Sequence, residues 1–477
     1  MRFFKLILLA ALVIVVGGGG YLWYAAGHEP GPVIAIAAPE KFVGRSTRLS
    51  VTIDSPTELS ASAVTVTQNG KPVTLGDQKT DVAGGKTTIS AVIGRDGLSN
   101  GSATLTVDAS RKTLYGYRTA TSHASRDLVV RLDPPRVAVT SSHQFINLGG
   151  AEFVVLRATP EGVEAGIMVG NVRYPFYPGT AVGITDPSVR VGFFALQHDQ
   201  DLNTKISAYA RDEAGNEASA AVDHQPFVKK FMDSRIPIDQ NFLDRVVPAI
   251  ASNTPEIKVD TGSPEGRLKG FLEINGHLRK KNGEYIASLA AKSQPRLLWT
   301  EAFKQMMNSQ VESRFADRRT YFFENKEIDR QVHLGFDLAT VQQAPVHASN
   351  EGVVAHADFL GIYGNCVIID HGLGVMSLYA HLSQIAVKVG DTVKKDQEIG
   401  RTGSTGLAGG DHLHFTMLVQ GVPVNPVEWW DPHWLQDRVF RKISEAGGPA
   451  SAVTTAAAEP AAKPARAAKP AARRRKR

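Results

Sequence analysis

Residues 410–418 read Gly-Asp-His-Leu-His-Phe-Thr-Met-Leu, a run typical of a β-strand that carries two histidines. Residues two apart on a strand face the same side, so His412 and His414 point into one space. Two imidazoles on one face are costly to bury unless each ring nitrogen finds a partner. A metal ion beside a substrate cleft would supply such partners, although an isolated His-x-His pair also fits an ordinary core.

The residues before this strand indicate that it belongs to a sheet. Three further β-type runs, at 352–356, 365–370 and 374–379, are separated by glycine and by aspartate or asparagine. Short β-type runs between such turn residues favour strands joined by tight connections. We therefore expect an antiparallel β domain over residues 309–436.

A second group of metal-type side chains lies in the segment His333-Leu-Gly-Phe-Asp337. A helix would place His333 and Asp337 on one face, but Gly335 and the β-rich surroundings favour an extended or bulged segment. Two histidines and one aspartate would leave one tetrahedral position for water, as in catalytic rather than structural zinc sites. The single cysteine, Cys366, forms no Cys-x-x-Cys pair, so His and carboxylate groups would have to hold the zinc.

Four motifs in this order resemble the lysostaphin/LytM family of zinc metallopeptidases. They are His333-x-Gly335-x-Asp337, the segment Tyr363–Gly372, Tyr379-Ala-His381-Leu, and His412-Leu-His414-Phe. The resemblance covers roughly residues 325–430. It implies an antiparallel β fold that cuts peptides in peptidoglycan, with one zinc ion bound by His333, Asp337 and His414.

The same resemblance implies that His381 and His412 stand beside the zinc without binding it. A histidine there can take the proton of the bound water and pass it to the leaving amine. We assign this role to His412 and a hydrogen bond to the oxyanion to His381, and the two roles could be exchanged. Many family members have glutamate where Thr416 stands, which puts a supporting contact of the zinc site in doubt.

His371 is interpreted as structural, and residues 403–410 either line the substrate groove or form a plain turn.

The N-terminus predicts export from the cytoplasm. Arg2 and Lys5 precede the apolar run Leu6–Gly27, which is long enough for one membrane span. Positive residues before such a run favour an N-inside orientation. We expect residues 1–28 to form a single-pass anchor in the inner membrane, with the catalytic domain in the periplasm. A cleaved signal peptide is the alternative.

Three units are expected between the anchor and the peptidase domain. Residues 30–133 and 134–225 hold short β-type runs between turns and predict two immunoglobulin-like β-sandwiches, acting as spacers or binding modules. In residues 226–308, Ser263-Pro264-Glu265 signals a helix start, so we expect a small helical region that is either a linker or a cap. The predicted fold class is therefore mainly β, with a transmembrane helix, two sandwiches, a helical region and a lysostaphin-type peptidase domain.

Residues 437–477 are expected to be a disordered basic tail. From Ala446 onward the chain carries eight Lys or Arg residues and one acid, while the whole chain has a net charge of +6. The rest of the chain is therefore close to neutral, which argues against a nucleic-acid-binding body. The tail could contact anionic wall polymers or lipid head groups, or simply be solvated.

These predictions indicate a membrane-anchored, zinc-dependent endopeptidase that hydrolyses peptidoglycan peptides with a metal-activated water.

One alternative is a catalytically silent relative that activates or scaffolds other wall hydrolases. Another is a carrier domain, because residues 389–400 resemble a lipoyl-domain turn, but no lysine stands at a suitable hairpin tip. If the helices or sandwiches cover the cleft, the enzyme is latent and needs a regulatory partner. A 309–436 fragment would then be at least as active as the whole chain.

Overall fold

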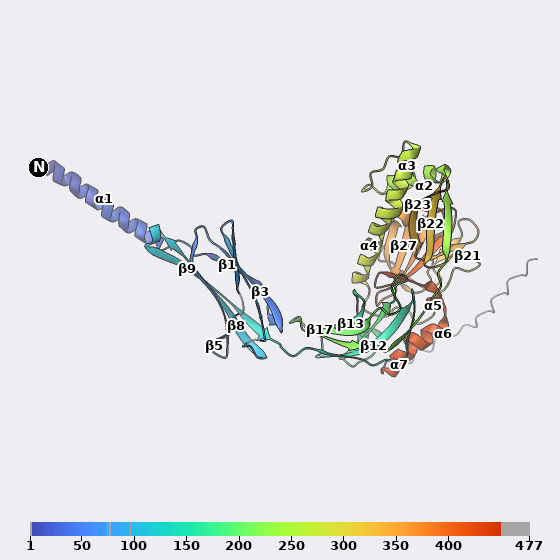
Figure 1. Cartoon of the computed structure of the whole chain (residues 1–477), viewed down its shortest axis with the longest axis horizontal. Coiled ribbons are helices and arrows are strands. Elements are labelled where there is room, and N and C mark those ends of the chain that lie inside the picture. The colour runs from blue at the N-terminus through green and yellow to red at the C-terminus, as the bar shows by residue number, and fades with distance from the viewer. Residues whose placement is uncertain (1, 74, 76–77, 96, 450–477) are drawn as a thin grey trace, which may run out of the picture.

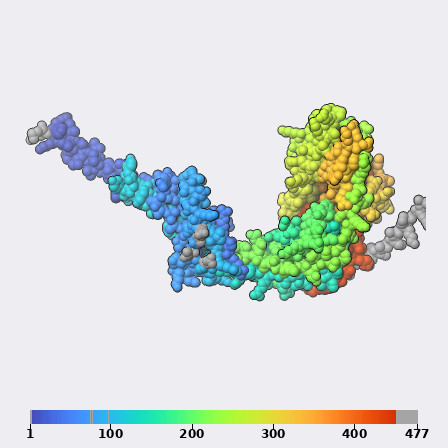
Figure 2. Space-filling model, viewed as in Figure 1, coloured from blue at the N-terminus to red at the C-terminus, as the bar shows by residue number. Residues whose placement is uncertain are grey.

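The computed structural model describes residues 2–73, 75, 78–95 and 97–449. The prediction of a mainly β chain with an N-terminal apolar helix is confirmed (Figure 1). Helix α1 (Arg2–Ala26) stands at one end, an all-β unit follows, and the remaining elements gather into a second, larger body (Figure 2). By length and composition the Phe3–Ala26 part of α1 is a candidate membrane span, and a signal sequence would have the same properties.

The first β unit is built from two sheets, in the strand orders β1-β3-β7-β6 and β2-β9-β8-β4-β5. Its strands are β1 (Val33–Ala38), β2 (Phe42–Val43), β3 (Ser46–Asp54), β4 (Leu59–Gln68), β5 (Lys71–Val73), β6 (Lys79–Ala83), β7 (Lys86–Gly94), β8 (Gly101–Thr113) and β9 (Arg118–Val130). Apolar side chains are buried at alternate positions, such as Leu49, Val51 and Ile53 on β3. This period of two is that of a strand with one face on the core.

The second β unit has the sheets β10-β12-β16-β15 and β14-β13-β17-β18, with the parallel pair β11-β19 beside them. Its strands are β10 (Arg136–Val139), β11 (Gln144–Asn147), β12 (Ala151–Thr159), β13 (Glu164–Val169), β14 (Val172–Pro175), β15 (Tyr177–Pro178), β16 (Val189–Ala195), β17 (Ile206–Arg211), β18 (Glu217–Ala221) and β19 (His224–Phe227). Strand β16 is buried on both faces, and Phe193 from it lies 5.3 Å, between ring centroids, from Trp429 of the C-terminal domain. This unit is therefore joined to the C-terminal domain by its core.

The C-terminal domain is organised around an antiparallel sheet in the order β21-β24-β32-β28-β27-β26-β30, with β33 paired to β32 and a small sheet β25-β31-β29. The strands are β21 (Gln310–Ser313), β24 (Phe336–Ala339), β25 (Pro345–His347), β26 (Gly352–Phe359), β27 (Asn365–Asp370), β28 (Val375–Leu382), β29 (Gln384–Ile385), β30 (Thr392–Val393), β31 (Glu398–Arg401), β32 (Leu413–Val419) and β33 (Val422–Val424). The central strands β28 and β32 are buried along their whole length. His371 is also buried, with its two ring nitrogens hydrogen-bonded to Glu351 O and Ser377 Oγ.

The helical region packs against this domain. Its elements are β20 (Asp233–Ile238), α2 (Gln240–Asn253), α3 (Pro264–Glu273), a π-helical turn (Ile274–Leu278) and α4 (Arg279–Leu289). Ser263 Oγ accepts the backbone N–H of Gly266, so α3 begins where its sequence predicted. Strand β20 pairs with β22 (Asp317–Phe323), which pairs with β23 (Lys326–His333). The buried faces of α2 and α3 share one core with Tyr321 and Ile362 of the C-terminal domain.

The C-terminal helices α5 (Pro426–Trp430), α6 (Pro432–Leu435) and α7 (Arg441–Glu445) lie against the second β unit (Figure 1). Lys442 Nζ is 2.8 Å from Glu152 Oε1, and both side chains are almost fully buried. Val439 and Phe440 are buried in the same core. A disordered tail from residue 437 is therefore wrong for residues 437–445, because these side chains fill an apolar interface. The basic residues from position 463 onward lie outside the described part of the chain.

Candidate active site

Three neighbouring strand ends bring the expected ligands together. His333 ends β23, Asp337 lies on β24 and His414 lies on β32. Asp337 and His414 are register partners in the antiparallel pair β24–β32. Gly335 makes the link from His333 to Asp337, and a Cβ at this glycine would lie 2.6 Å from His414 Cε1. Only glycine lets the backbone approach the imidazole so closely.

The donor atoms of these residues form a small triangle. His333 Nε2 is 2.9 Å from Asp337 Oδ1 and 2.9 Å from His414 Nδ1, and the third side is 3.1 Å. Zinc–ligand bonds of about 2.0–2.1 Å in tetrahedral geometry place donor atoms about 3.3 Å apart. The triangle therefore needs to open by only a few tenths of an ångström to hold zinc, and its donor types are those that zinc prefers. Among the described residues these three form a metal-type cluster with ligand atoms within 4.8 Å of one another.

Hydrogen bonds set which ring nitrogen is unprotonated in each of the two histidines of the triangle. His333 Nδ1 lies 3.2 Å from Arg314 O, which can only accept, and 3.2 Å from Ser313 Oγ, whose proton goes to Asp317 Oδ2. Nδ1 therefore carries the proton of His333, and Nε2 is left with its lone pair. The Thr416 hydroxyl donates to Leu334 O at 2.9 Å and therefore accepts from His414 Nε2 at 3.0 Å. His414 is thus left with an unprotonated Nδ1. Thr416 supplies the kind of outer contact that orients metal-binding imidazoles.

Arg319 holds the carboxylate of Asp337 and was not identified from the sequence. Its Nη2 donates to Asp337 Oδ2 at 2.8 Å, which leaves Oδ1 facing the two histidines. Its Nε donates to Asp317 Oδ2 at 3.3 Å. Burial disfavours the ionised form of Asp337, but the charge and hydrogen bonds of the surrounding histidines outweigh it and hold the pKa of Asp337 well below its usual range. The carboxylate is therefore ionised and ready to bind a cation.

His381 and His412 face the same site from two other positions. His381 Nδ1 donates to Thr405 O at 2.8 Å, and His412 Nδ1 donates to Gly410 O at 2.9 Å. Each ring thus has Nε2 free of the backbone, and the ring centroids are 4.9 Å apart. His412 Nε2 lies 3.5 Å from Asp337 Oδ1. His381 has a left-handed backbone with φ of 62°, a strained conformation of the kind found at functional sites.

The two rings have opposite pKa shifts. Burial, with the neighbouring His412 and His414, holds the pKa of His381 well below its usual value. Burial also disfavours the charged form of His412, but its hydrogen bond and attraction to Asp337 prevail and raise its pKa. Two histidines whose pKa values are driven apart are typical of acid–base sites.

A small cavity opens onto this cluster, and all five predicted site residues line it. Tyr363, at the end of the 3-10 turn Gly361–Tyr363, and Leu407 line it as well, so the 403–410 loop reaches this cavity. Arg279, the first residue of α4, lines it as well. The position of Arg279 had no signal in the sequence, because it lies far from the motifs and reaches the cavity only through the fold.

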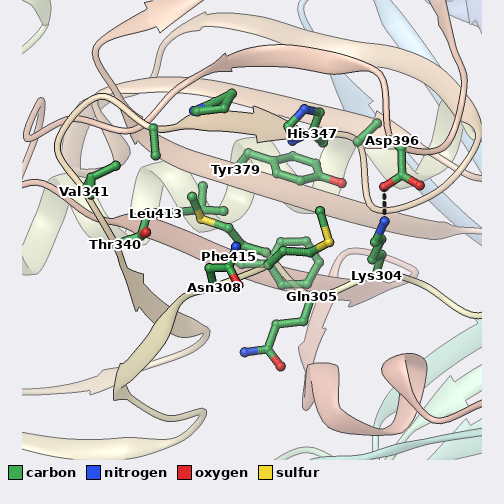
Figure 3. A pocket seen from close by; sticks show the side chains of 15 residues that line it. Lys304, Gln305, Asn308, Thr340, Val341, His347, Tyr379, Asp396, Leu413 and Phe415 are labelled. Atoms are coloured by element: carbon green, nitrogen blue, oxygen red, sulfur yellow. Dashed lines mark hydrogen bonds and ion pairs between the residues drawn. The ribbon is translucent and has the colours of Figure 1, made fainter. Parts of the chain in front are cut away.

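A different pocket lies on the other face of β32 (Figure 3). Leu413 and Phe415 point into it together with Tyr379, while His412 and His414 point the opposite way. Its lining is largely apolar, and Lys304 pairs with Asp396 at 2.8 Å on its border. The metal-type chemistry therefore belongs to the cavity of the histidines.

Comparisons with known proteins point to one peptidase family. Residues 331–426 match peptidase family M23. The DD-carboxypeptidase/endopeptidase Mpg of Neisseria meningitidis is 45% identical over 97 residues, which are 20% of this chain and 22% of that protein. The peptidoglycan DD-endopeptidase ShyA of Vibrio cholerae is 32% identical over 163 residues, 34% of each chain. The chain thus matches between a fifth and about a third of the length of these relatives.

Solved structures of the same kind are also similar in part. The catalytic domain of lysostaphin from Staphylococcus simulans is 29% identical, with 26% of this chain and 92% of that one covered and a TM-score of 0.23. A putative peptidase M23 from Pseudomonas aeruginosa is 17% identical, with 60% and 94% covered and a TM-score of 0.37.

Proposed function

We propose that this chain, which carries an M23 peptidase domain at residues 331–426, is a zinc-dependent endopeptidase that hydrolyses peptide bonds of peptidoglycan. The observation that carries the proposal is the buried triangle of His333, Asp337 and His414, with the free Nε2 atoms of two more histidines beside it. One zinc ion per domain would be held by the three residues of the triangle. The names of the relatives, DD-endopeptidases among them, support the substrate class.

Zinc, when bound there, lowers the pKa of its water and polarises the carbonyl of the scissile bond. The residues of the chain then move the protons. His412 Nε2 stands 3.5 Å from a donor atom of the triangle, and we assign it to take the proton of the water and deliver it to the leaving amine. His381 turns its Nε2 to the same cavity and is assigned to the oxyanion. Because the pKa of His381 is low and its proton lies on Nδ1, this role requires Nε2 to gain a second proton, which the negative charge that develops on the oxyanion would favour.

Arg319 and Thr416 are proposed to keep the triangle in shape. Arg319 occupies one carboxylate oxygen of Asp337, so the other is directed at the cation. Thr416 fixes the ring of His414 through Nε2. Arg319 is permanently charged and paired with Asp337 and Asp317, and Thr416 does not line the cavity, so neither residue is assigned to proton transfer.

We further propose that α1 anchors the chain in the inner membrane and leaves the peptidase domain in the periplasm, where peptidoglycan is. The length and apolar composition of α1 support this placement. Basic residues before the span favour the same orientation.

Digestion of purified sacculi tests the proposed function. The full chain, solubilised in detergent and loaded with zinc, should cleave cross-linked peptides into separate stem peptides. Mass spectrometry should show that each cleavage adds the mass of one water. The His414→Ala variant, purified in the same way, should release none. The silent-activator alternative would be supported instead if the wild-type chain alone left sacculi intact but made another hydrolase degrade them faster than that hydrolase does by itself.

A further inference from the structure

The cavity of the metal triangle contains a cation that the proposed hydrolysis does not use. Arg279 and Arg319 both line this cavity. Arg319 is paired with Asp337 and Asp317, whereas Arg279 makes no ion pair with any residue that the structure describes. A guanidinium group is permanently charged, so the cavity holds one positive charge with no carboxylate of its own.

The side chain of Arg279 is held in a defined orientation. Its Nη2 donates to Asn275 Oδ1 at 2.6 Å and its Nε donates to Asn275 O at 3.1 Å. Asn275 is fully buried and is itself fixed, because its Nδ2 donates to Asp329 Oδ2 at 2.7 Å. A guanidinium has five N–H donors, so this arrangement positions the group and leaves donors unused. Such preorganisation lowers the entropy lost when a ligand binds.

The backbone around Arg279 is also unusual. Residues 274–278 form a π-helical turn between α3 and α4, and Asn275 lies within it. Isolated π-helical turns occur frequently at functional sites. Here the turn brings the Asn275 carbonyl oxygen and side chain to the same arginine.

We infer that Arg279 binds a carboxylate of the substrate, so that the enzyme prefers peptides with a free carboxylate next to the scissile amide. The inference rests on the proposed function and specifies its substrate class. Arginine binds carboxylates through paired, charge-assisted hydrogen bonds, which are stronger than neutral ones. A free carboxylate in this position arises from an acidic side chain, from a chain end, or from a residue whose side-chain amine forms the cleaved amide. Arg279 is a specificity-determining residue in this scheme, with no part in proton transfer.

Two synthetic peptides test the inference. They share a D-alanyl amide formed on the side-chain amine of a diamino acid and differ only in whether the adjoining carboxyl group is free or amidated. The zinc-loaded full chain should cleave the free acid with a kcat/KM about 10- to 100-fold higher, the range of one charge-assisted hydrogen bond. The Arg279→Gln variant should cleave the two peptides with equal kcat/KM. The KM for the free acid should rise, and kcat should stay within a few-fold of wild type.

Lys280→Gln is the matched control. It removes the positive charge next to Arg279 in the sequence, and the Lys280 side chain is 81% exposed and lies outside the cavity. It should keep the preference, and Arg279→Lys should keep part of it. Equal cleavage of both peptides by wild type, or an unchanged preference in Arg279→Gln, would overturn the inference. A merely structural role of Arg279 would lower both rates together and leave their ratio intact, which also overturns it. Cleavage of neither peptide nor of sacculi by wild type would instead defeat the proposed function.

Discussion

Asp337 and His414 are direct register partners on neighbouring antiparallel strands, and Asp337 Oδ1 lies 3.1 Å from His414 Nδ1. The pairing matters because a slip of one residue would turn every side chain of β32 to the other face. His414 would then enter the apolar pocket that Leu413 and Phe415 line in Figure 3. The register of one strand pair thus determines whether these metal-type side chains come together.

Replacing site histidines should separate zinc binding from turnover. His414→Ala removes one of three ligands, so bound zinc should fall to a small fraction and hydrolysis should be lost. His381→Ala leaves the triangle intact and should retain near-stoichiometric zinc, while the rate falls by about 10²–10³-fold, as for the loss of one hydrogen bond to an oxyanion. Metal analysis after gel filtration measures the first quantity and sacculus digestion the second. Loss of zinc from His381→Ala would show that the division between ligands and catalytic residues is wrong.

Thr416 should contribute to zinc affinity although it cannot reach the ion. Thr416→Val keeps the shape but removes the hydroxyl that accepts from His414 Nε2. Losing such an outer contact is expected to weaken zinc binding by about 10- to 100-fold. Competition with a chromogenic chelator measures the affinity, and Thr416→Ser, which keeps a hydroxyl, should stay near wild type. Equal affinities in Thr416→Val and wild type would exclude this role.

The buried pair of Lys442 and Glu152 should stabilise the joint between the second β unit and the peptidase domain. Lys442→Met removes the closer ion-pair partner of Glu152 and leaves Arg438, whose Nη1 lies 4.0 Å from Glu152 Oε2, so the free energy of unfolding should fall by about 3 kcal/mol, the lower end of the range for a broken buried pair. Arg441→Met, which removes an exposed partner of Asp437 and Glu445, should cost under about 1 kcal/mol. Urea unfolding monitored by tryptophan fluorescence compares the two. An equally small loss of unfolding free energy in both variants would mean that the Lys442–Glu152 pair does not stabilise the joint.

Glu428 should make stability depend on pH at the same joint. Burial raises its pKa to about 7, and its carboxylate accepts hydrogen bonds from Asn147 Nδ2 and Ala151 N. The folded state therefore holds its proton more tightly than the unfolded state, whose pKa is near 4.5. Stability from this group is complete below pH about 4.5 and is lost as pH rises to about 7, by at most about 3 kcal/mol. The midpoint temperatures of thermal unfolding at pH 5 and pH 8 should differ less in Glu428→Gln than in wild type. An unchanged difference would refute the assignment.

Much of the candidate site was readable from the sequence because its predicted ligands lie in short, ordered motifs. His333 and Asp337 are four residues apart, and His414 shares a strand with His412, so local pattern placed all of them. The confirmed resemblance to M23 peptidases rests on the same motifs. Arg319 and Arg279 were missed because an arginine in a strand or helix carries no local mark of what it faces.

The extent of the core could not be predicted either. The sequence suggested separate units, yet one cluster of buried side chains runs from Ile146 in the second β unit to Ile443 in α7. Apolar strands such as β16 look the same whether they face one core or two. A 309–436 fragment would cut through this cluster and lose the helices that pack on Tyr321 and Ile362. Its activity would therefore report on folding rather than on latency.

Anomalous X-ray diffraction at the zinc absorption edge, from crystals of the zinc-loaded full chain, tests the central claim most directly. The account predicts one peak in the peptidase domain, about 2.0–2.1 Å from His333 Nε2, Asp337 Oδ1 and His414 Nδ1, with a solvent molecule as the fourth ligand. A peak bound elsewhere, or one whose fourth ligand is a protein side chain that closes the site, would contradict it.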